Sequence, residues 1–343
     1  MSRRYQFTVA IFVLWIVGLY TAGTFSGENP LTTISRINPL FLVLALSSYV
    51  LAVCVGVSIL SLCLKHLKAK VKRKAIAKAW IFGSFVDNVM PTVMPAGEGM
   101  MAYFLNKFYD VPYSKGLAAI GLYVSAWGLS VTFFSAGFLL LATQFISVPS
   151  SYLTLAWIVV GLFALITVGW LIFLSKKSML EGTVCRLLQL WNRIQNKIKK
   201  RKVSIERCVV NVEFEKSYKT LESILQNKGL IIKASLAFFI PQLAHAFCIF
   251  FILTGFGYSV PFLGVLLIHI FSSIAGLLAL IPSGLGVYEV GASGLLIELF
   301  GVPGNIAIAT VFLYRLIFVW ITNFVGGFVG LRQGIDDVKP VKK

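Results

Sequence analysis

Long apolar runs fill most of this 343-residue chain and limit what it can fold into. A helix crosses the hydrocarbon core of a bilayer with roughly 20 mostly apolar residues. Runs of about that length cover residues 6–22, 39–64, 114–143, 152–174, 229–254, 262–281 and 303–331, with shorter pieces at 79–94 and 287–300. Because 58% of the residues are hydrophobic and only 13% are charged, the chain is unlike an average soluble domain. The sequence therefore predicts an all-α polytopic membrane protein, with 1–343 as a single integral membrane domain.

The net charge of +18 is concentrated in two loops. Residues 65–78 carry seven Lys or Arg and no acid, and residues 175–228 carry thirteen against five acids. The connections at 23–38, 144–151 and 255–261 contain one basic residue, Arg36. By the positive-inside rule, this asymmetry predicts a multi-pass protein of the cell membrane with both termini and both basic loops in the cytoplasm.

The same charges restrict the partners of the protein. Basic loops beside a membrane attract anionic lipid headgroups, so membrane lipids are the expected partners. No nucleic-acid recognition module accompanies the basic run KIKKRK at 197–202, so no nucleic acid is expected. The loop at 175–228 is predicted to be a basic cytoplasmic loop with an amphipathic helix near residues 187–194 on the membrane surface.

Two segments share an order of prolines, glycines and tyrosines that predicts an internal repeat. One is MPAGEGMMAYFLNKFYDVPYSKGLAAIGLY at 94–123, and the other is IPSGLGVYEVGASGLLIELFGVPGNIAIATVFLYR at 281–315. The matched positions are Pro95 with Pro282, Gly97 with Gly284, Gly99 with Gly286, and Tyr123 with Tyr314. The first repeat is expected at about 39–143 and the second at about 229–331.

A topology of about six full spans plus two re-entrant helical hairpins places every basic cluster of the sequence on the cytoplasmic side. One hairpin, at 79–106, enters from the cytoplasm and turns near Pro95, and the other, at 262–300, enters from the outside and turns near Pro282. The two halves are then an inverted repeat. The alternative, in which 262–281 spans fully, puts the C-terminal tail outside and stays open on the sequence alone.

The two breaks also indicate where a site lies. Irregular backbone inside a membrane persists only where protein buries it or where it lines a wet cavity, and paired breaks mark the binding sites of many transporters. Intramembrane ionisable residues are costly and need a partner or water. The candidate substrate or proton site is Asp87, Asn88, Glu98, Glu289 and Arg315, and the expected hairpin turns contain Pro95, Gly97, Gly99, Pro282, Ser283, Gly284 and Gly286.

Several candidates have a structural alternative. Glu98 follows a proline and either complements a helix dipole or holds a ligand or proton. Arg315 either forms a structural ion pair with Glu289 or anchors phosphate oxygens with its planar guanidinium. His245 and His269 are expected to be packing residues with satisfied hydrogen bonds. Nucleotide-binding, zinc-protease and serine-hydrolase motifs are absent from the sequence, and the cysteines lack C-x-x-C spacing, so no cofactor or metal is expected.

The motifs around both breaks resemble those of a known family. Asn88, Pro91 and Pro-Ala-Gly-Glu at 95–98, with Pro-Ser-Gly-Leu-Gly-Val-Tyr-Glu at 282–289 and Tyr-Arg-Leu at 314–316, are similar to the transmembrane domain of lysylphosphatidylglycerol synthases. The likeness covers about residues 6–331. In that family the first motif usually continues Gly-Glu-x-x-Arg, whereas here Met101 occupies the arginine position.

The resemblance implies a function. In two-part synthases a soluble domain aminoacylates phosphatidylglycerol and the membrane domain is implicated in moving the product between leaflets. The 343 residues leave no room for such a soluble domain beside the membrane domain, so the resemblance leads us to expect a flippase-like translocase of a phospholipid or lipid-linked glycan rather than an aminoacyltransferase. Two alternatives stay open: an intramembrane enzyme using Asp87, Glu98 and Glu289 as acid and base, and an accessory membrane subunit of a cytoplasmic glycosyltransferase.

Overall fold

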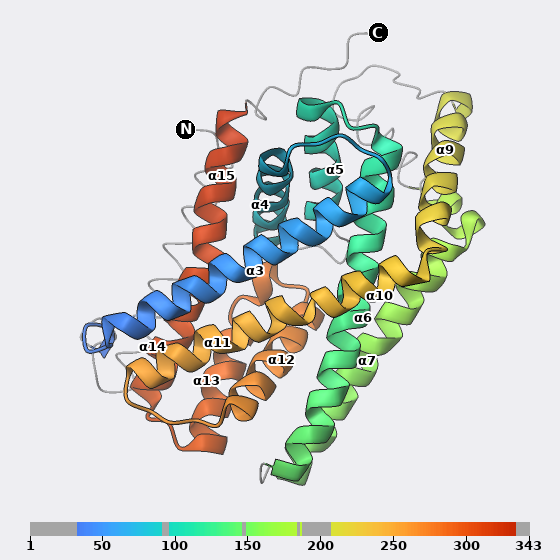
Figure 1. The fold of residues 1–343 in the computed structure, drawn as a ribbon. Coiled ribbons are helices and arrows are strands. Elements are labelled where there is room, and N and C mark those ends of the chain that lie inside the picture. Colours follow the sequence, from blue (N-terminus) through green and yellow to red (C-terminus); the bar gives the residue numbers. More distant parts are fainter. Residues whose placement is uncertain (1–32, 91–95, 146–148, 184–185, 187–206, 334–343) are drawn as a thin grey trace, which may run out of the picture.

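The computed structural model describes residues 33–90, 96–145, 149–183, 186 and 207–333, and in these ranges every regular element is a helix (Figure 1). The all-α prediction is confirmed for this part of the chain. The predicted span at 6–22, the predicted amphipathic helix near 187–194, the turn residue Pro95 and the basic tail beyond residue 333 lie outside the described residues.

Within the described ranges, five helical units are long and apolar enough to cross a membrane. They are α3 (Pro39–His66), α6 (Tyr113–Phe145), α7 (Ser150–Ser175), the unit Lys228–Gly255 formed by α10 (Lys228–Ala237) and α11 (Phe239–Gly255), and the unit Gly304–Arg332 formed by α14 (Gly304–Arg315), the π-helical turn η2 (Leu316–Trp320) and α15 (Ile321–Arg332). Each coincides with one of the predicted apolar runs. The prediction of a polytopic membrane protein is therefore confirmed.

Local sequence signals set where these helices begin. Asn38 caps α3, because its side-chain oxygen accepts a hydrogen bond from the backbone N–H of Leu40 at 3.0 Å, and Pro39 occupies the first helical position. Asn227 caps α10 in the same way, accepting from the N–H of Leu230 at 3.0 Å. Large apolar side chains stay exposed along the outer faces of the bundle, as expected for helices that contact lipid.

Two helical hairpins are inserted between the long helices. The first consists of α4 (Arg73–Val89) and α5 (Ala96–Tyr109), and the second of α12 (Phe262–Leu278) and α13 (Val287–Phe300). At about 1.5 Å per residue, α5 and α13 are each about 21 Å long, shorter than a hydrocarbon core of about 30 Å. The hairpins enter from opposite ends of the bundle (Figure 1), and α4 contacts the turn η1 (Pro282–Gly284) of the second hairpin. Their tips therefore meet inside the bundle.

Each hairpin is held closed near its tip by two glycines in close contact. A Cβ on Gly97 would lie 2.1 Å from the carbonyl oxygen of Gly83, and a Cβ on Gly284 would lie 2.8 Å from the Cα of Gly276. Gly97 and Gly284 are also the glycines matched between the two sequence motifs. Both hairpins therefore use a similar device, a glycine that makes close contact with the backbone of the first limb: Gly97 from the second limb and Gly284 from the turn.

The described parts of the two basic loops lie at one end of the bundle. The α3–α4 connection, the start of α6, the end of α7 and the end of α15 all lie at the upper end of Figure 1. At this end the Lys115 ammonium donates a hydrogen bond to the carbonyl oxygen of Lys68 at 3.3 Å. The end of α6, the start of α7 and the α11–α12 connection lie at the other end. The charge asymmetry of the sequence is therefore also an asymmetry in space.

Part of the basic loop forms a helix that the sequence prediction did not contain. This helix, α9 (Arg207–Leu225), packs along α6, and its Leu221 and Ile224 are buried. The Tyr218 hydroxyl donates to the carbonyl oxygen of Ser175 at 3.0 Å, and Lys177 pairs with Glu215. The end of the loop is thus attached to the bundle.

The glycine contact at the first hairpin tip predicts a specific stability difference. Gly97→Ala forces a methyl group against the Gly83 carbonyl and the Asp87 carboxylate, so it should destabilise the purified protein by about 1–3 kcal/mol. Gly99 lies two residues away in the same helix, and a Cβ added to it would have nothing within 4 Å. Gly99→Ala should leave the melting temperature unchanged or raise it. Equal melting temperatures for the two variants would contradict this account of the tip.

Candidate functional site at the hairpin tips

The turn of the second hairpin is built from left-handed backbone. Ser283, Gly284 and Gly286 have φ values of 57°, 62° and 86°. Glycine adopts this region without penalty, whereas a serine there is strained unless its surroundings hold it. The carbonyl oxygen of Ser283 accepts a hydrogen bond from Nη2 of Arg315 at 2.7 Å. Arg315 therefore holds a strained residue of the turn in place.

Arg315 also forms a buried ion pair with Glu289. Its Nε donates to Oε1 of Glu289 at 2.7 Å, and the two residues are only 5% and 8% exposed. The second carboxylate oxygen, Oε2, accepts from the backbone N–H of Gly286 at 2.7 Å and so caps α13. The guanidinium lies over the Tyr288 ring, 5.1 Å from its centroid. Of the two alternatives for Arg315, the ion pair is thus present, and it holds turn and helices together.

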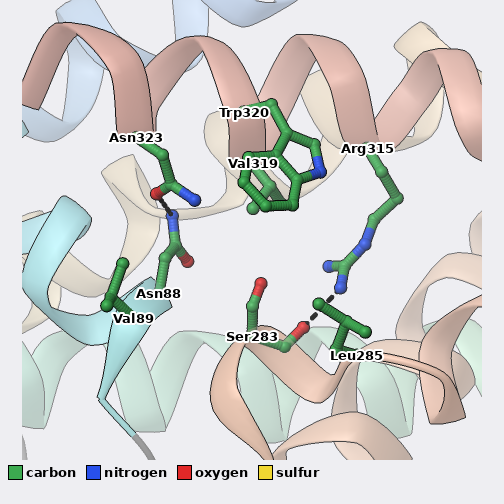
Figure 2. Close-up of a pocket in the computed structure, with 8 residues that line it drawn as sticks. All are labelled: Asn88, Val89, Ser283, Leu285, Arg315, Val319, Trp320 and Asn323. Atoms are coloured by element: carbon green, nitrogen blue, oxygen red, sulfur yellow. Dashed lines mark hydrogen bonds between the residues drawn. The ribbon is translucent and has the colours of Figure 1, made fainter. Parts of the chain in front are cut away.

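The first hairpin reaches the same place from the opposite end. The Asn88 side chain donates from Nδ2 to Oδ1 of Asn323 at 2.9 Å, which links α4 to α15. Figure 2 shows Asn88 and Val89 on one side, Ser283 and Leu285 on the other, and Arg315, Val319, Trp320 and Asn323 along the C-terminal helical unit. The pocket among these eight residues measures about 10 Å³, which is the space of about one water. The tips are therefore closed against each other.

Asp87 and Glu98 form a carboxyl pair at the base of the first tip. Oδ1 of Asp87 accepts from the backbone N–H of Gly97 at 2.6 Å, and the two carboxyl groups interact electrostatically. Oε2 of Glu98 is buried without a hydrogen-bond partner among the described residues. Adjacent, poorly hydrated carboxylates repel each other. Such a pair is suited to share a proton or to receive a cationic group.

Met101 explains why this pair has no arginine partner. It occupies the position where the first motif of the resembling family usually has arginine, and it is only 2% exposed. Its side chain fills the space above Gly83, whose added Cβ would lie 2.3 Å from Cγ of Met101. Among the described residues, no basic group acts electrostatically on Asp87 or Glu98. The two hairpin tips therefore differ in charge, although they share a glycine contact.

A larger cavity of about 210 Å³ lies beside the tips. It is bounded by residues of α3, α4, α6, α11, η2 and α15, and Asn88 lines both this cavity and the small pocket. Two hydrogen bonds fix its aromatic walls: Nε1 of Trp80 donates to the Tyr123 hydroxyl at 2.7 Å, and the hydroxyls of Tyr49 and Thr322 are 2.9 Å apart. The sequence prediction missed these wall residues, although Tyr123 is one of the positions matched between the two motifs.

The remaining candidates lie in varied places. Gly97 and Gly99 belong to the first turn of α5 rather than preceding it. Glu298, another acid in an apolar run of the sequence, is an exposed residue of α13. His245 and His269 stack with ring centroids 4.9 Å apart, and their Nδ1 atoms lie 2.9 Å and 3.1 Å from the hydroxyls of Tyr314 and Tyr288 respectively. Within the described ranges, no group of three or more His, Cys, Asp or Glu side chains is arranged to hold a metal ion.

Comparison with known proteins shows similarity to membrane proteins over most of the chain. The family model described as the lysylphosphatidylglycerol synthase TM region matches residues 5–326. A UPF0104 membrane protein of Pyrococcus horikoshii is 25% identical over 331 residues, covering 95% of this chain and 94% of the relative. A UPF0104 membrane protein of Methanothermobacter thermautotrophicus is 28% identical and covers 71% of this chain and 70% of the relative. Another, from Methanocaldococcus jannaschii, is 25% identical and covers 88% of each.

The buried ion pair predicts unequal effects of single and double substitutions. Glu289→Gln keeps an oxygen for the Gly286 N–H but leaves Arg315 unpaired, so it should destabilise the protein by about 3–5 kcal/mol. Arg315→Met should cost a similar amount, and the double variant should be more stable than the sum of the two losses predicts. Glu298→Gln, the same change at an exposed position, is the control. Additive single losses in thermal unfolding would contradict a coupled pair.

Proposed function

The chain belongs to the lysylphosphatidylglycerol synthase TM region family of membrane proteins, and we propose that it translocates the polar headgroup of a lipid between membrane leaflets. The observation that carries the proposal is the meeting of two short helical hairpins, from opposite ends of the bundle, around Arg315 and Asn88. As re-entrant hairpins they would place polar groups near the middle of the bilayer. A headgroup would cross there while its acyl chains stay in the surrounding lipid.

The arrangement of the helices supports an inverted repeat. Helices α3, α4, α5 and α6 correspond in order to α11, α12, α13 and the α14–α15 unit. The contacts follow the same correspondence, because α4 packs against α15 while α12 packs against α6, and α3 packs against α11. Inverted repeats of this kind place a transporter's site at the repeat interface and allow access to alternate between the two sides.

The polar groups at the tips have complementary roles in this mechanism. The N-terminal end of α13 lies beside Arg315, and helix N-termini together with arginine favour a phosphate. Arg315 donates to Glu289 and Ser283 through Nε and Nη2, so Nη1 stays available for a phosphate oxygen when the tips part. The Asp87–Glu98 pair would take up a proton or a cationic group during the same step. Movement of the tips is required, because the pocket between them has room for only about one water.

Reconstitution into liposomes tests the proposal. Wild-type protein should exchange fluorescent phospholipids or glycolipids between leaflets faster than empty liposomes do. Glu98→Gln should slow this exchange about tenfold, the equivalent of about 1.4 kcal/mol in the barrier. Glu298→Gln makes the same change on the exposed face of α13 and should leave the rate unaltered.

Two outcomes would count against translocation. Exchange equal to that of empty liposomes across a broad lipid panel would contradict it directly. A change in lipid identity, detected by mass spectrometry of the recovered lipids, would instead indicate an intramembrane enzyme, because a translocase alters only sidedness.

The proposed orientation places the basic end of the bundle in the cytoplasm of the cell, together with both termini. In a cysteine-free background, Lys70→Cys at the basic end should resist a membrane-impermeant maleimide in intact cells and react after lysis. Ser151→Cys at the opposite end should react in intact cells. Both positions are exposed, so the reverse labelling pattern would overturn the orientation.

A further inference from the structure

The large cavity beside the hairpin tips has a specific chemical character. Aromatic residues and uncharged polar residues line it. The aromatic ones include Trp80, Trp127, Phe318 and His245, and the hydroxyl or amide residues are Tyr49, Ser84, Asn88, Tyr123, Gln242 and Thr322. Among the described residues that line the cavity, none is Asp, Glu, Lys or Arg. At about 210 Å³ it far exceeds the roughly 10–15 Å³ that a single water requires.

Some polar groups of the wall are available to a ligand. Within the described part of the chain, neither the Gln242 carboxamide nor the Ser84 hydroxyl takes part in a side-chain hydrogen bond. Asn88 donates through Nδ2 to Asn323, so its carbonyl oxygen can still accept. By contrast, the Trp80 indole is fixed, because it packs on Gly56, whose added Cβ would lie 3.0 Å from the ring, and donates to Tyr123. The cavity thus offers a rigid aromatic wall and adaptable hydrogen-bonding groups.

We propose that this cavity binds a neutral, polyhydroxylated headgroup, such as the sugar ring of a glycolipid. A sugar ring has an apolar face that packs on an aromatic ring and a rim of hydroxyls that both donate and accept. Side-chain amides and hydroxyls match that rim without introducing charge. The inference rests on the proposed lipid translocation and names the class of headgroup that this protein would carry.

The two charged alternatives fit the walls less well. A phosphate placed in the cavity would find no Lys or Arg on its lining, and a quaternary ammonium would find aromatic faces but no carboxylate. The Asp87–Glu98 pair acts electrostatically on Tyr123 but does not line the cavity. The phosphate of a glycolipid would instead lie toward Arg315, because Asn88 joins the cavity to the small pocket that Arg315 lines.

The full chain, purified in a sugar-free detergent, provides the test. Three lipids with the same acyl chains are titrated into the protein: dioctanoyl glucosylglycerol, dioctanoylglycerol and dioctanoyl phosphatidylcholine. Native mass spectrometry measures how much of each lipid is bound. The glucosyl lipid should bind about tenfold more tightly than either of the others. Equal binding of dioctanoylglycerol, or tighter binding of phosphatidylcholine, would overturn the inference.

Variants of the cavity test whether the preference for the glucosyl lipid arises there. Gln242→Leu should weaken binding of the glucosyl lipid about fivefold or more while sparing dioctanoylglycerol, and Gln144→Leu, at an exposed position near the end of α6, should change neither. Ala52→Phe fills the cavity from α3 and should have the effect of Gln242→Leu. Retention of the sugar preference in both cavity variants, at unchanged melting temperature, would place the binding elsewhere and contradict the assignment.

Two further comparisons distinguish a lipid-borne sugar from a free sugar, and test the cavity assignment separately from the proposed translocation. Methyl glucoside binding as tightly as the glucosyl lipid would identify a free sugar as the ligand and contradict a lipid-borne one, whereas weaker binding would support the lipid-borne sugar. A protein that prefers the glucosyl lipid but moves no lipid between leaflets contradicts the proposed function alone. Leaflet exchange without any sugar preference contradicts the cavity assignment alone.

Discussion

The buried contact between Arg315 and Glu289 is the interaction on which the inner part of the bundle depends. It neutralises two charges that a membrane interior tolerates poorly, and its polar atoms fix separate pieces of chain. Nε and Nη2 of Arg315 hold the carboxylate and the Ser283 carbonyl, while Oε2 of Glu289 caps α13. The hairpin turn, the helix that follows it and the last membrane-spanning unit are thereby joined at one point.

A π-helical turn directly follows this arginine. The segment η2 covers Leu316–Trp320, and single-turn π-helices inside α-helices frequently occur at functional sites. Its residues include Phe318, which borders the large cavity, and Val319 and Trp320, which border the small pocket. The irregular turn thus presents side chains to both spaces from one short stretch of helix.

Much of this architecture follows from the sequence, because apolar length and charge bias act locally. The runs at 39–64, 114–143 and 152–174 are helices within a few residues of their predicted ends, and the helix break at Pro282 lies where proline and glycine indicated. At the first break, Gly97 and Gly99 were predicted to lie in the turn but are part of α5. The cavity was not predictable in the same way. Trp80 and Tyr123 look like ordinary packing residues in apolar runs until tertiary contacts place them side by side. The position of α9 also depends on tertiary packing, since Leu221 and Ile224 are buried only by the neighbouring bundle.

The two hairpins of the bundle share a close glycine contact near the tip but differ in the charged residues that they carry there. Gly97 and Gly284 make equivalent close contacts, yet one tip carries a neutralised ion pair and the other an acid pair beside Met101. In a bundle that alternates access, identical tips would bind the same group with equal strength on both sides. Under the proposed translocation, unequal tips would instead give one side a place for a phosphate and the other a place for a proton or a cation. Because Asn88 lies at the first tip and lines both spaces, opening the contact between the tips would join the small pocket to the large cavity. A headgroup held in the cavity would then reach Arg315 by movement of the first hairpin alone, while the ion pair keeps the second hairpin in place.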